Sequence, residues 1–254
     1  MAAIVNLRGL WDNDDDDDNN NDNNDNNNDN GFVEQYETTG HDICNESILI
    51  RQFSFHIANA NFIWPGAYDL AIYLDSHIDN YNGRILELGS ATGFLSVFLA
   101  LKLSKSNNKN NNNNNDDSNN NDNNDMLVTS DIDDGGQVEQ NIKYNFELNN
   151  ITKVTHIAHT WGTGWELSIK EYNNCCASSF KYIIASDILL YVKVYPDLVK
   201  TLSELFDGGT IEKFIMSWKR RIAESKIFFD LMIEAGFNLE KPDNYNGTIY
   251  IFTR

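Results

Sequence analysis

The residues of this sequence that are best suited to chemistry lie in a short glycine loop. The segment Glu87-Leu88-Gly89-Ser90-Ala91-Thr92-Gly93 sets two glycines four residues apart, directly after an apolar run. Glycine lets a backbone turn tightly and approach a ligand closely, and a helix that follows such a loop offers free N–H groups at its first turn. We therefore expect cofactor contacts from Glu87, Gly89, Ser90, Thr92 and Gly93.

The spacing of the loop argues against a dinucleotide cofactor. A dinucleotide fold requires the pattern GxGxxG, which leaves room for a pyrophosphate, and this loop lacks the middle glycine at that spacing. The zwitterionic methionine tail of S-adenosylmethionine carries no phosphate and fits the loop better. S-adenosylmethionine is therefore the expected cofactor.

The next predicted strand ends in Thr129-Ser130-Asp131-Ile132-Asp133. A carboxylate at the end of the second strand of a nucleotide-binding sheet is well placed to accept hydrogen bonds from both ribose hydroxyls. Asp131 is the first candidate for this contact and Asp133 the second. The alternative is a helix N-terminal cap, which Asp133 or Asp134 could supply.

An aromatic side chain follows the third predicted strand, at Thr160-Trp161-Gly162. Trp161 could cover the adenine face of the cofactor by stacking, which is worth roughly 1–3 kcal/mol by analogy with nucleic-acid bases. The alternative is that Trp161 belongs to the core or its rim.

Alternating strands and helices are expected to position these residues. Apolar runs bounded by turn residues predict strands, and apolar residues with helical spacing predict helices. The predicted strands are 47–55, 84–88, 126–130, 154–159, 182–186, 213–218, 237–240 and 248–252, and the predicted helices are 66–78, 93–102, 137–149, 195–206 and 225–235. The seven strands from 84–88 onward, with the helices between them, predict an α/β fold. It is a Rossmann-like, doubly wound, seven-stranded sheet, mostly parallel with a C-terminal antiparallel hairpin.

Two stretches of the 254-residue chain, 12–30 and 107–125, consist almost wholly of Asn and Asp. Segments without apolar residues cannot offset the entropy of ordering, so both are predicted to be disordered. We expect an N-terminal extension at 1–44 that holds the first tract, a domain at 45–254, and the second tract as an insertion within that domain. Residues 31–40 are expected to be a polar lead-in.

The tracts also account for much of the net charge of −19, because 18 basic and 25 acidic residues lie outside them. A basic face that could bind nucleic acid is not expected from this balance. The three cysteines, Cys44, Cys175 and Cys176, form no CxxC pair, so neither a metal site nor a disulfide framework is expected. The sequence has no apolar run near ~20 residues, and we expect no signal sequence because the apolar start, 1–11, is too short for one. We expect a soluble, intracellular monomer in the cytoplasm, with the nucleus as the alternative.

Taken together, these residues resemble the seven-β-strand protein-lysine methyltransferases of family 16, the methyltransferase-like 21 type. The resemblance covers residues 45–254. It rests on the glycine loop and Asp131, and on three further segments: Trp64-Pro65 with the helix after it, Trp161-Gly162, and Ala185-Ser186-Asp187 followed by Tyr191. The resemblance implies that S-adenosylmethionine donates the methyl group and that a protein with an accessible lysine accepts it. It also implies cofactor contacts from Trp64 and Ser186.

The sequence departs from the family pattern at two places. Ala91 stands where the family loop has its middle glycine, which we expect to be tolerated if φ is negative there. The family also spaces its aromatic residue three positions after the aspartate, whereas here Tyr191 follows Asp187 by four.

Methyl transfer to lysine requires the amine to lose its proton, and its unperturbed pKa is about 10.4. Burial among aromatic side chains lowers the pKa of an amine, and a carboxylate can orient it or take its proton. Asp187 is the candidate for that carboxylate, and Tyr191 and Trp64 are candidate channel walls that can also face the sulfonium. The alternative is that Asp187 caps the next turn and Tyr191 is part of the core.

Two other functions fit the same sequence. One is a methyltransferase acting on a small molecule or on a protein histidine. The other is a binding module of the same fold that has lost its chemistry, a hypothesis that only Ala91 supports.

Overall fold

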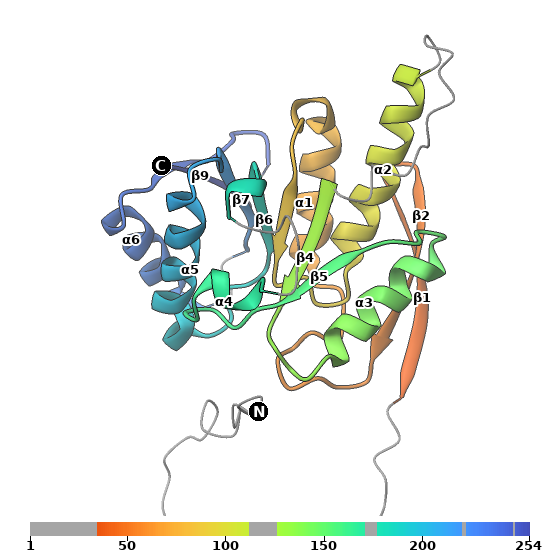
Figure 1. Cartoon of the computed structure of the whole chain (residues 1–254), viewed down its shortest axis with the longest axis horizontal. Coiled ribbons are helices and arrows are strands. Elements are labelled where there is room, and N and C mark those ends of the chain that lie inside the picture. Colours follow the sequence, from red (N-terminus) through yellow and green to blue (C-terminus); the bar gives the residue numbers. More distant parts are fainter. Residues whose placement is uncertain (1–34, 112–125, 171–176, 220–221, 246) are drawn as a thin grey trace, which may run out of the picture. The chain divides into compact units, whose positions relative to one another are not determined.

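A seven-stranded sheet forms the centre of the computed structural model (Figure 1). Its strands are β3 (Ile85–Leu88), β4 (Leu127–Asp131), β5 (Thr155–Ala158), β6 (Tyr182–Ser186), β7 (Lys213–Ser217), β8 (Asn238–Glu240) and β9 (Ile249–Thr253). They lie in the order β5-β4-β3-β6-β7-β9-β8. The pairs from β5 to β7 are parallel, whereas β9 is antiparallel to both β7 and β8. The predicted fold class is confirmed.

The structure describes residues 35–111, 126–170, 177–219, 222–245 and 247–254. These belong to one compact unit, Glu34–Arg254. The predicted disordered tract at 12–30 lies outside the described residues, as does the part of the predicted insertion from 112 to 125.

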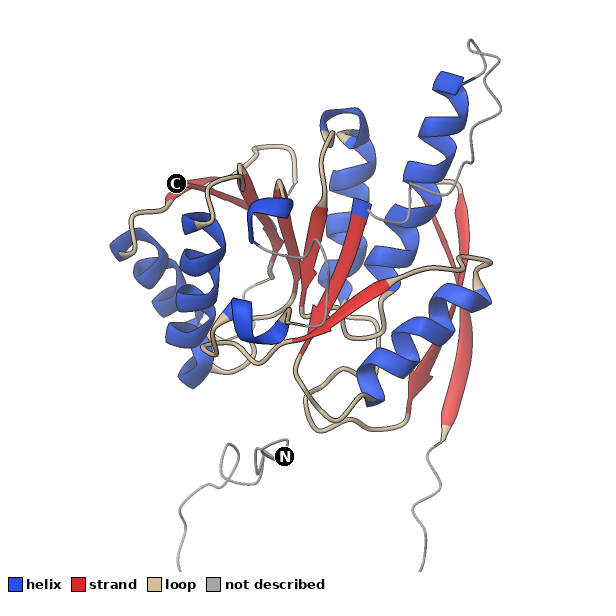
Figure 2. Ribbon diagram, viewed as in Figure 1, coloured by secondary structure: helices blue, strands red, loops and turns tan. Residues whose placement is uncertain are grey.

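Helices cover both faces of the sheet (Figure 2). They are α1 (Pro65–Ser76), α2 (Phe94–Asn111), α3 (Gln137–Leu148), α4 (Trp165–Ser168), α5 (Tyr195–Asp207) and α6 (Lys226–Glu234). Residues of α1, α2 and α3 bury one apolar core against the sheet, and residues of α4, α5 and α6 bury the other. Strand β3 contributes to both, with Ile85 in the first core and Leu86 and Leu88 in the second. This alternation follows from the two-residue period of a strand and directs Glu87 toward the face of α1 and α2.

A two-stranded hairpin, β1 (Tyr36–Ile43) and β2 (Glu46–Phe53), precedes the sheet. The sequence predicts β2 but not β1, whose residues 36–40 belong to the polar lead-in predicted at 31–40. The side chains of β1 are mostly polar and exposed, so they give no apolar pattern. The strand is formed by pairing with β2 over its full length. The turn residues Cys44 and Asn45 both have positive φ, as a two-residue hairpin turn requires. The predicted domain boundary at residue 45 thus falls inside this hairpin.

The outer edge of β2 is covered by amide side chains of α3. Asn145 accepts a hydrogen bond of 2.7 Å from the N–H of Arg51 and donates one of 3.0 Å to its carbonyl, and Asn149 makes the same pair of bonds with Leu49. Side-chain amides that pair with a strand edge satisfy backbone groups that would otherwise be left open. Asn145 also donates to the carbonyl of Thr92 at 2.9 Å, which ties the hairpin to the glycine loop.

Helix α2 continues to Asn111, past its predicted end at residue 102. Extending a formed helix adds one hydrogen bond for each residue that is fixed, so polar residues can continue it. None of the helices in the described part of the chain is both long and apolar enough to cross a membrane. The described residues also contain no group of three His, Cys, Asp or Glu side chains that could hold a metal ion.

Candidate active site

The glycine loop between β3 and α2 adopts a left-handed backbone at three positions. The φ angles of Gly89, Ala91 and Gly93 are +69°, +48° and +77°. A Cβ atom on Gly89 would lie 2.7 Å from a methyl carbon of Ile188, so this position excludes any side chain. A Cβ on Gly93 would lie 3.3 Å from Ile142 of α3. Gly89 is therefore favoured both by the turn and by the packing of Ile188, whereas Gly93 is favoured mainly by its left-handed backbone.

The positive φ of Ala91 corrects the expectation of a negative angle at this residue. A left-handed backbone brings Cβ close to the following carbonyl and costs roughly 1 kcal/mol for a residue other than glycine. A hydrogen bond stabilises this conformation, because the backbone N–H of Ala91 donates to the carboxylate of Asp131 at 2.7 Å. Alanine is thus accommodated here with strain.

A small pocket opens where the loop meets the ends of β3 and β6. Six of the predicted cofactor residues line it: Trp64, Glu87, Gly89, Ser90, Thr92 and Ser186. The remaining lining residues are Phe62, Ile63, Ala67, Ala91, Phe94 and Leu95. The pocket is therefore largely apolar on the side of α1 and α2 and polar along the loop.

Glu87 is the buried acid of this pocket, with only 1% of its surface exposed. Burial raises the pKa of its carboxyl group to about 8, although hydrogen bonds from Ser96 and Ser90 act in the opposite direction. The hydroxyl of Ser96 on α2 donates to one carboxyl oxygen. Burial therefore favours the protonated form of Glu87.

Asp131 ends β4 beside the loop. Its two carboxylate oxygens accept backbone hydrogen bonds, one from Ala91 at 2.7 Å and one from Ile132 at 2.8 Å. Burial raises the pKa of Asp131, while these two N–H groups lower it in part. Each carboxylate oxygen can accept a second hydrogen bond, so capacity for ribose hydroxyls remains.

The neighbouring acids have different roles. Asp134 caps α3, since its carboxylate accepts the N–H groups of Gly136 and Val138, both at 3.0 Å. It also accepts a hydrogen bond of 3.0 Å from His56. Asp133 is exposed, and its carboxylate accepts the N–H of Gly135 at 3.3 Å. Asp134 therefore caps the helix, and Asp131 contacts the glycine loop instead.

Trp161 lies against the glycine loop from the side of β5. Its ring atom Cζ2 is 3.9 Å from the position that a Cβ on Gly89 would take, and the side chain is half-buried at the edge of the second core. The turn after it is fixed by Thr201 of α5, whose hydroxyl accepts the N–H of Gly162 at 3.0 Å. Trp161 is thus placed beside the loop, partly open to a ligand.

Asp187 follows β6 and binds the start of α1. Its carboxylate accepts a hydrogen bond of 2.7 Å from the N–H of Gly66, in the first turn of α1, where unpaired N–H groups and the helix dipole favour an anion. Ser217 of β7 donates to the carbonyl of the same Gly66 at 2.5 Å. A Cβ on Gly66 would lie 2.6 Å from Ser217 Oγ and 2.8 Å from the Asp187 carboxylate, so glycine is required there.

Asp187 is 2% exposed and does not line the pocket described above. The helix that it caps is α1, which begins just after Trp64, and not the turn that follows Asp187. The hydrogen bond between Asp187 and Gly66 therefore connects the end of β6 to the segment that carries Trp64, which lines the pocket.

Tyr191 is linked to Trp64 through a residue that the sequence does not single out. The side-chain amide of Asn59 donates to the hydroxyl of Tyr191, and the backbone carbonyl of Asn59 accepts a hydrogen bond of 3.0 Å from Trp64 Nε1. Trp64 packs on Phe62, with ring centroids 4.4 Å apart. Burial raises the pKa of the Tyr191 phenol.

The structure thus brings the predicted cofactor residues together around one loop, and it connects Asp187 and Tyr191 to that region by hydrogen bonds. Sequence analysis did not identify Asn59, Phe62 or Ser96. Ser96 contacts Glu87, nine residues earlier, and Asn59 contacts Tyr191, 132 residues later. Phe62 lies in a loop without a recognisable motif. No local sequence pattern therefore identifies these three residues.

Comparison with known proteins assigns the family. The family model described as lysine methyltransferase matches residues 45–235, which is more than half of the chain. The chain therefore belongs to the lysine methyltransferase family.

Curated relatives are similar at low identity. The chain is 22% identical over 187 residues to protein-lysine methyltransferase METTL21E of Mus musculus, covering 72% of this chain and 66% of that protein, just under two thirds of its length. It is 23% identical over 190 residues to protein N-lysine methyltransferase METTL21A of Xenopus tropicalis, covering 74% of each. Among solved structures, the 16S rRNA N2 G1207 methyltransferase RsmC of T. thermophilus has a TM-score of 0.53 at 12% identity, covering 86% of this chain and 50% of that one. At that identity the structural likeness shows the shared fold alone.

Proposed function

We propose that this chain transfers a methyl group from S-adenosylmethionine to a lysine side chain of a protein. The observation that carries the proposal is the pocket at the end of β3, where the glycine loop, the buried Glu87 and Trp64 converge. Membership of the lysine methyltransferase family supports the acceptor class, as do the relatives that are named protein-lysine methyltransferases.

The residues around the loop match the parts of the cofactor in turn. Glu87 and the backbone N–H groups of the loop would bind the amine and carboxylate of the methionine tail. Asp131 would accept the ribose hydroxyls, and the half-buried Trp161 would lie on the adenine. When bound, S-adenosylmethionine supplies a methyl group on a sulfonium that is already activated for in-line displacement.

The chain's task at the acceptor is to align a neutral amine. Phe62 and Trp64 form an apolar wall at the pocket. An amine beside such a wall loses bound water, and its pKa falls because the charged form is no longer solvated. The lone pair of the lysine nitrogen would have to face the methyl group that the bound cofactor would supply. Holding the two reacting atoms in line is the main contribution that a protein can make to this step.

Asp187 is the predicted carboxylate that either orients the lysine amine or takes its proton. The contact between its carboxylate and the N–H of Gly66 supports a positioning role, in which Asp187 fixes the start of α1 and hence Trp64. We propose that Asp187 positions the acceptor wall and that solvent takes the proton. Tyr191 is proposed as a second wall beyond Trp64.

The proposal is tested by methyl transfer with tritiated S-adenosylmethionine, the purified protein and a whole-cell protein extract. Labelled proteins are hydrolysed and their amino acids separated. The expected result is label in methylated lysine that is lost with Asp131→Ala. Label that appears only in methylated histidine, or only in small molecules, would contradict the lysine assignment, and no label in any fraction would favour a binding module.

A protein partner with an accessible lysine follows from the proposed acceptor. The acidic balance of the chain leads us to propose that it acts without nucleic acid. Action as a monomer and location in the cytoplasm or the nucleus are proposals that rest on composition.

A further inference from the structure

One loop residue, Asn59, joins two aromatic side chains that come from opposite sides of the candidate site. Trp64 precedes α1 and Tyr191 follows β6, 127 positions later in the chain. The Asn59 side-chain amide donates to the Tyr191 hydroxyl, and its backbone carbonyl accepts from Trp64 Nε1 at 3.0 Å. Both polar groups of the aromatic pair are therefore oriented by the same residue.

The backbone of Asn59 is held in an unusual conformation. Its φ angle is +57°, in the left-handed region that asparagine tolerates better than most residues. Its N–H donates to the carbonyl of His56 at 3.0 Å, which closes a tight turn. An asparagine at this position thus combines a turn-forming backbone with a side chain that reaches Tyr191.

The turn is anchored to the far side of the glycine loop. His56 is buried, accepts the N–H of Ala58 at Nδ1 at 3.2 Å, and faces Asp134 across 3.0 Å from Nε2. Since Nδ1 accepts a hydrogen bond, Nε2 carries the proton and donates to Asp134. Asp134 caps α3, so the position of Asn59 is fixed against a rigid helix.

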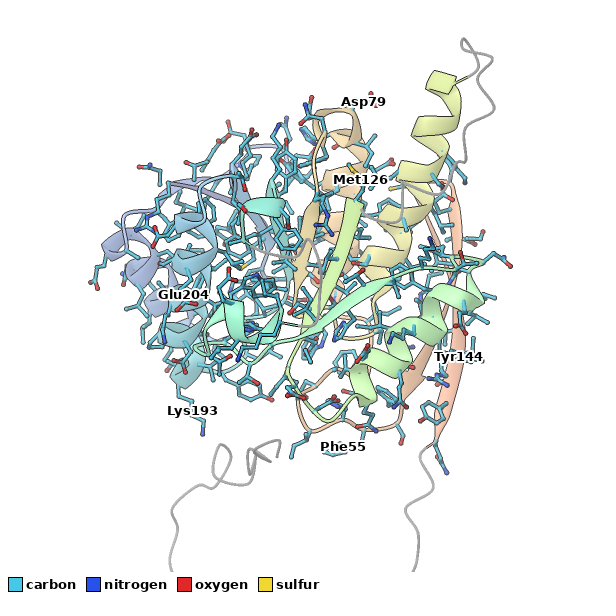
Figure 3. All side chains as sticks on the ribbon, viewed as in Figure 1. Phe55, Asp79, Met126, Tyr144, Lys193 and Glu204 are labelled. Atoms are coloured by element: carbon cyan, nitrogen blue, oxygen red, sulfur yellow. The ribbon has the colours of Figure 1, made fainter. Side chains whose placement is uncertain are left out.

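The turn lies toward the end of the sheet where the glycine loop follows β3. In Figure 3, Phe55 of this loop and Lys193 lie toward the carboxyl ends of the parallel strands, whereas Met126, just before β4, lies toward their other end. Phe55 is 67% exposed. The loop that holds Asn59 therefore has an exposed end at Phe55, and its last residues, Phe62, Ile63 and Trp64, line the pocket.

We infer that Asn59 is a positioning residue for the acceptor amine, because it sets the orientation of Trp64 and Tyr191 as walls of the lysine channel. The inference rests on the proposed function, since it assigns these aromatics to the acceptor side of that site. A cation or amine on the reactive side of the cofactor interacts with their ring faces. Fixed rings lower the cost of ordering the channel when an amine enters.

Two ligands separate the acceptor side of the site from the cofactor side. S-adenosylhomocysteine lacks the transferred methyl group, so nothing on its sulfur projects toward the acceptor channel, whereas its analogue sinefungin carries an amine in place of that methyl group. Calorimetry on the full chain measures both dissociation constants for wild type, Asn59→Gly, Tyr191→Phe and the double variant. Glycine keeps the positive φ of position 59 and the carbonyl that binds Trp64, so Asn59→Gly removes only the side chain. Asn150→Gly is the matched control, because Asn150 also has a positive φ, +60°, and lies at the end of α3.

The expected result is that Asn59→Gly and Tyr191→Phe each weaken sinefungin by about threefold to tenfold, the usual worth of a hydrogen bond. Binding of S-adenosylhomocysteine should change by less than about twofold, and the double variant should lose no more than either single variant, because both remove one interaction. An unchanged ratio of the two dissociation constants in Asn59→Gly, or losses that multiply in the double variant, would overturn this inference and leave the proposed function standing. A wild-type chain that binds neither ligand removes the proposed function and this inference with it.

Discussion

The backbone N–H of Ala91 donates a hydrogen bond of 2.7 Å to Oδ2 of Asp131. This bond joins the tip of the glycine loop to the end of the neighbouring strand, so the two halves of the candidate cofactor site are mechanically connected. It also holds Ala91 at a φ of +48°, where the family pattern has glycine. The loop therefore keeps its shape at the expense of local strain.

Relief of that strain gives the first prediction. Ala91→Gly should leave the free energy of unfolding unchanged or raise it by up to about 1 kcal/mol, because relief of roughly 1–2 kcal/mol of steric cost offsets the roughly 0.5–1 kcal/mol that glycine costs in chain entropy. Urea denaturation measures this change. Ala100→Gly, within α2, is the control and should lower stability by roughly 0.5–1 kcal/mol through added chain entropy. Destabilisation by both substitutions would contradict the strain at Ala91.

The choice between Asp131 and its neighbour gives the second prediction. Asp131→Ala should weaken the binding of S-adenosylmethionine about tenfold or more, because a carboxylate that binds both the ligand and the loop is lost. Asp133→Ala should change affinity little, since Asp133 is exposed and its carboxylate binds the N–H of Gly135 rather than the glycine loop. Calorimetric titration of both variants decides the matter, and equal losses would assign the ligand contact to neither residue alone.

The third prediction concerns pH. Burial raises the pKa of Glu87 to about 8 in the folded chain, from 4.5 as the ordinary value. The unfolded state therefore binds fewer protons than the folded state between these values, and stability should fall as pH rises from about 4.5 to about 8. The slope due to this residue is at most about 1.4 kcal/mol per pH unit. It is measured as the difference between wild type and Glu87→Gln, and a difference that does not vary with pH would show that folding does not raise the pKa of Glu87.

The same carboxyl group should respond to the cofactor. If the methionine ammonium approaches Glu87, it lowers the pKa of that group and a proton is released on binding near pH 7. Titration in two buffers of different ionisation enthalpy should show this release for wild type and a smaller one for Glu87→Gln. Identical heats in both buffers would place the ammonium elsewhere.

The fourth prediction separates a positioning role from a proton-accepting role at Asp187. The amide oxygen of Asp187→Asn can still accept the N–H of Gly66, and asparagine tolerates the φ of +51° found there. Methyl transfer by this variant should stay within a few-fold of wild type, with an unchanged pH profile. Asp187→Ala should lose about 1–2 kcal/mol of stability with the cap. A loss of activity of about 10²-fold or more in Asp187→Asn would instead identify a proton acceptor.

Local patterns in the sequence were sufficient for most of the fold. The strands at Ile85 and Tyr182 are short, mostly apolar runs that are buried on both faces, and α5 has regular apolar spacing, so their positions agree with the prediction within one or two residues. Strand β1 was missed because its exposed side chains are polar and its order comes from pairing with β2. Its turn, Cys44-Asn45, is not a sequence typical of a hairpin.

The site was predictable where it depends on local sequence and unpredictable where it depends on distant contacts. The glycine loop and Asp131 follow directly from strands and could be placed. The sign of φ at Ala91 could not, because it is imposed by a hydrogen bond to a residue 40 positions away. Asn59 was missed for the same reason, since its partner Tyr191 is 132 positions away.

The most direct test of the account is calorimetric titration of S-adenosylmethionine into the wild type and Gly89→Ala. A side chain at Gly89 would clash with Ile188 and strain a φ of +69°, inside the proposed cofactor loop. Gly209→Ala is the matched control, because Gly209 has a φ of +91° but a Cβ there would meet no atom within 4 Å beyond its chain neighbours. The account predicts saturable one-to-one binding to wild type and to Gly209→Ala, and its loss in Gly89→Ala. No binding to wild type, or equal binding to all three, would contradict it.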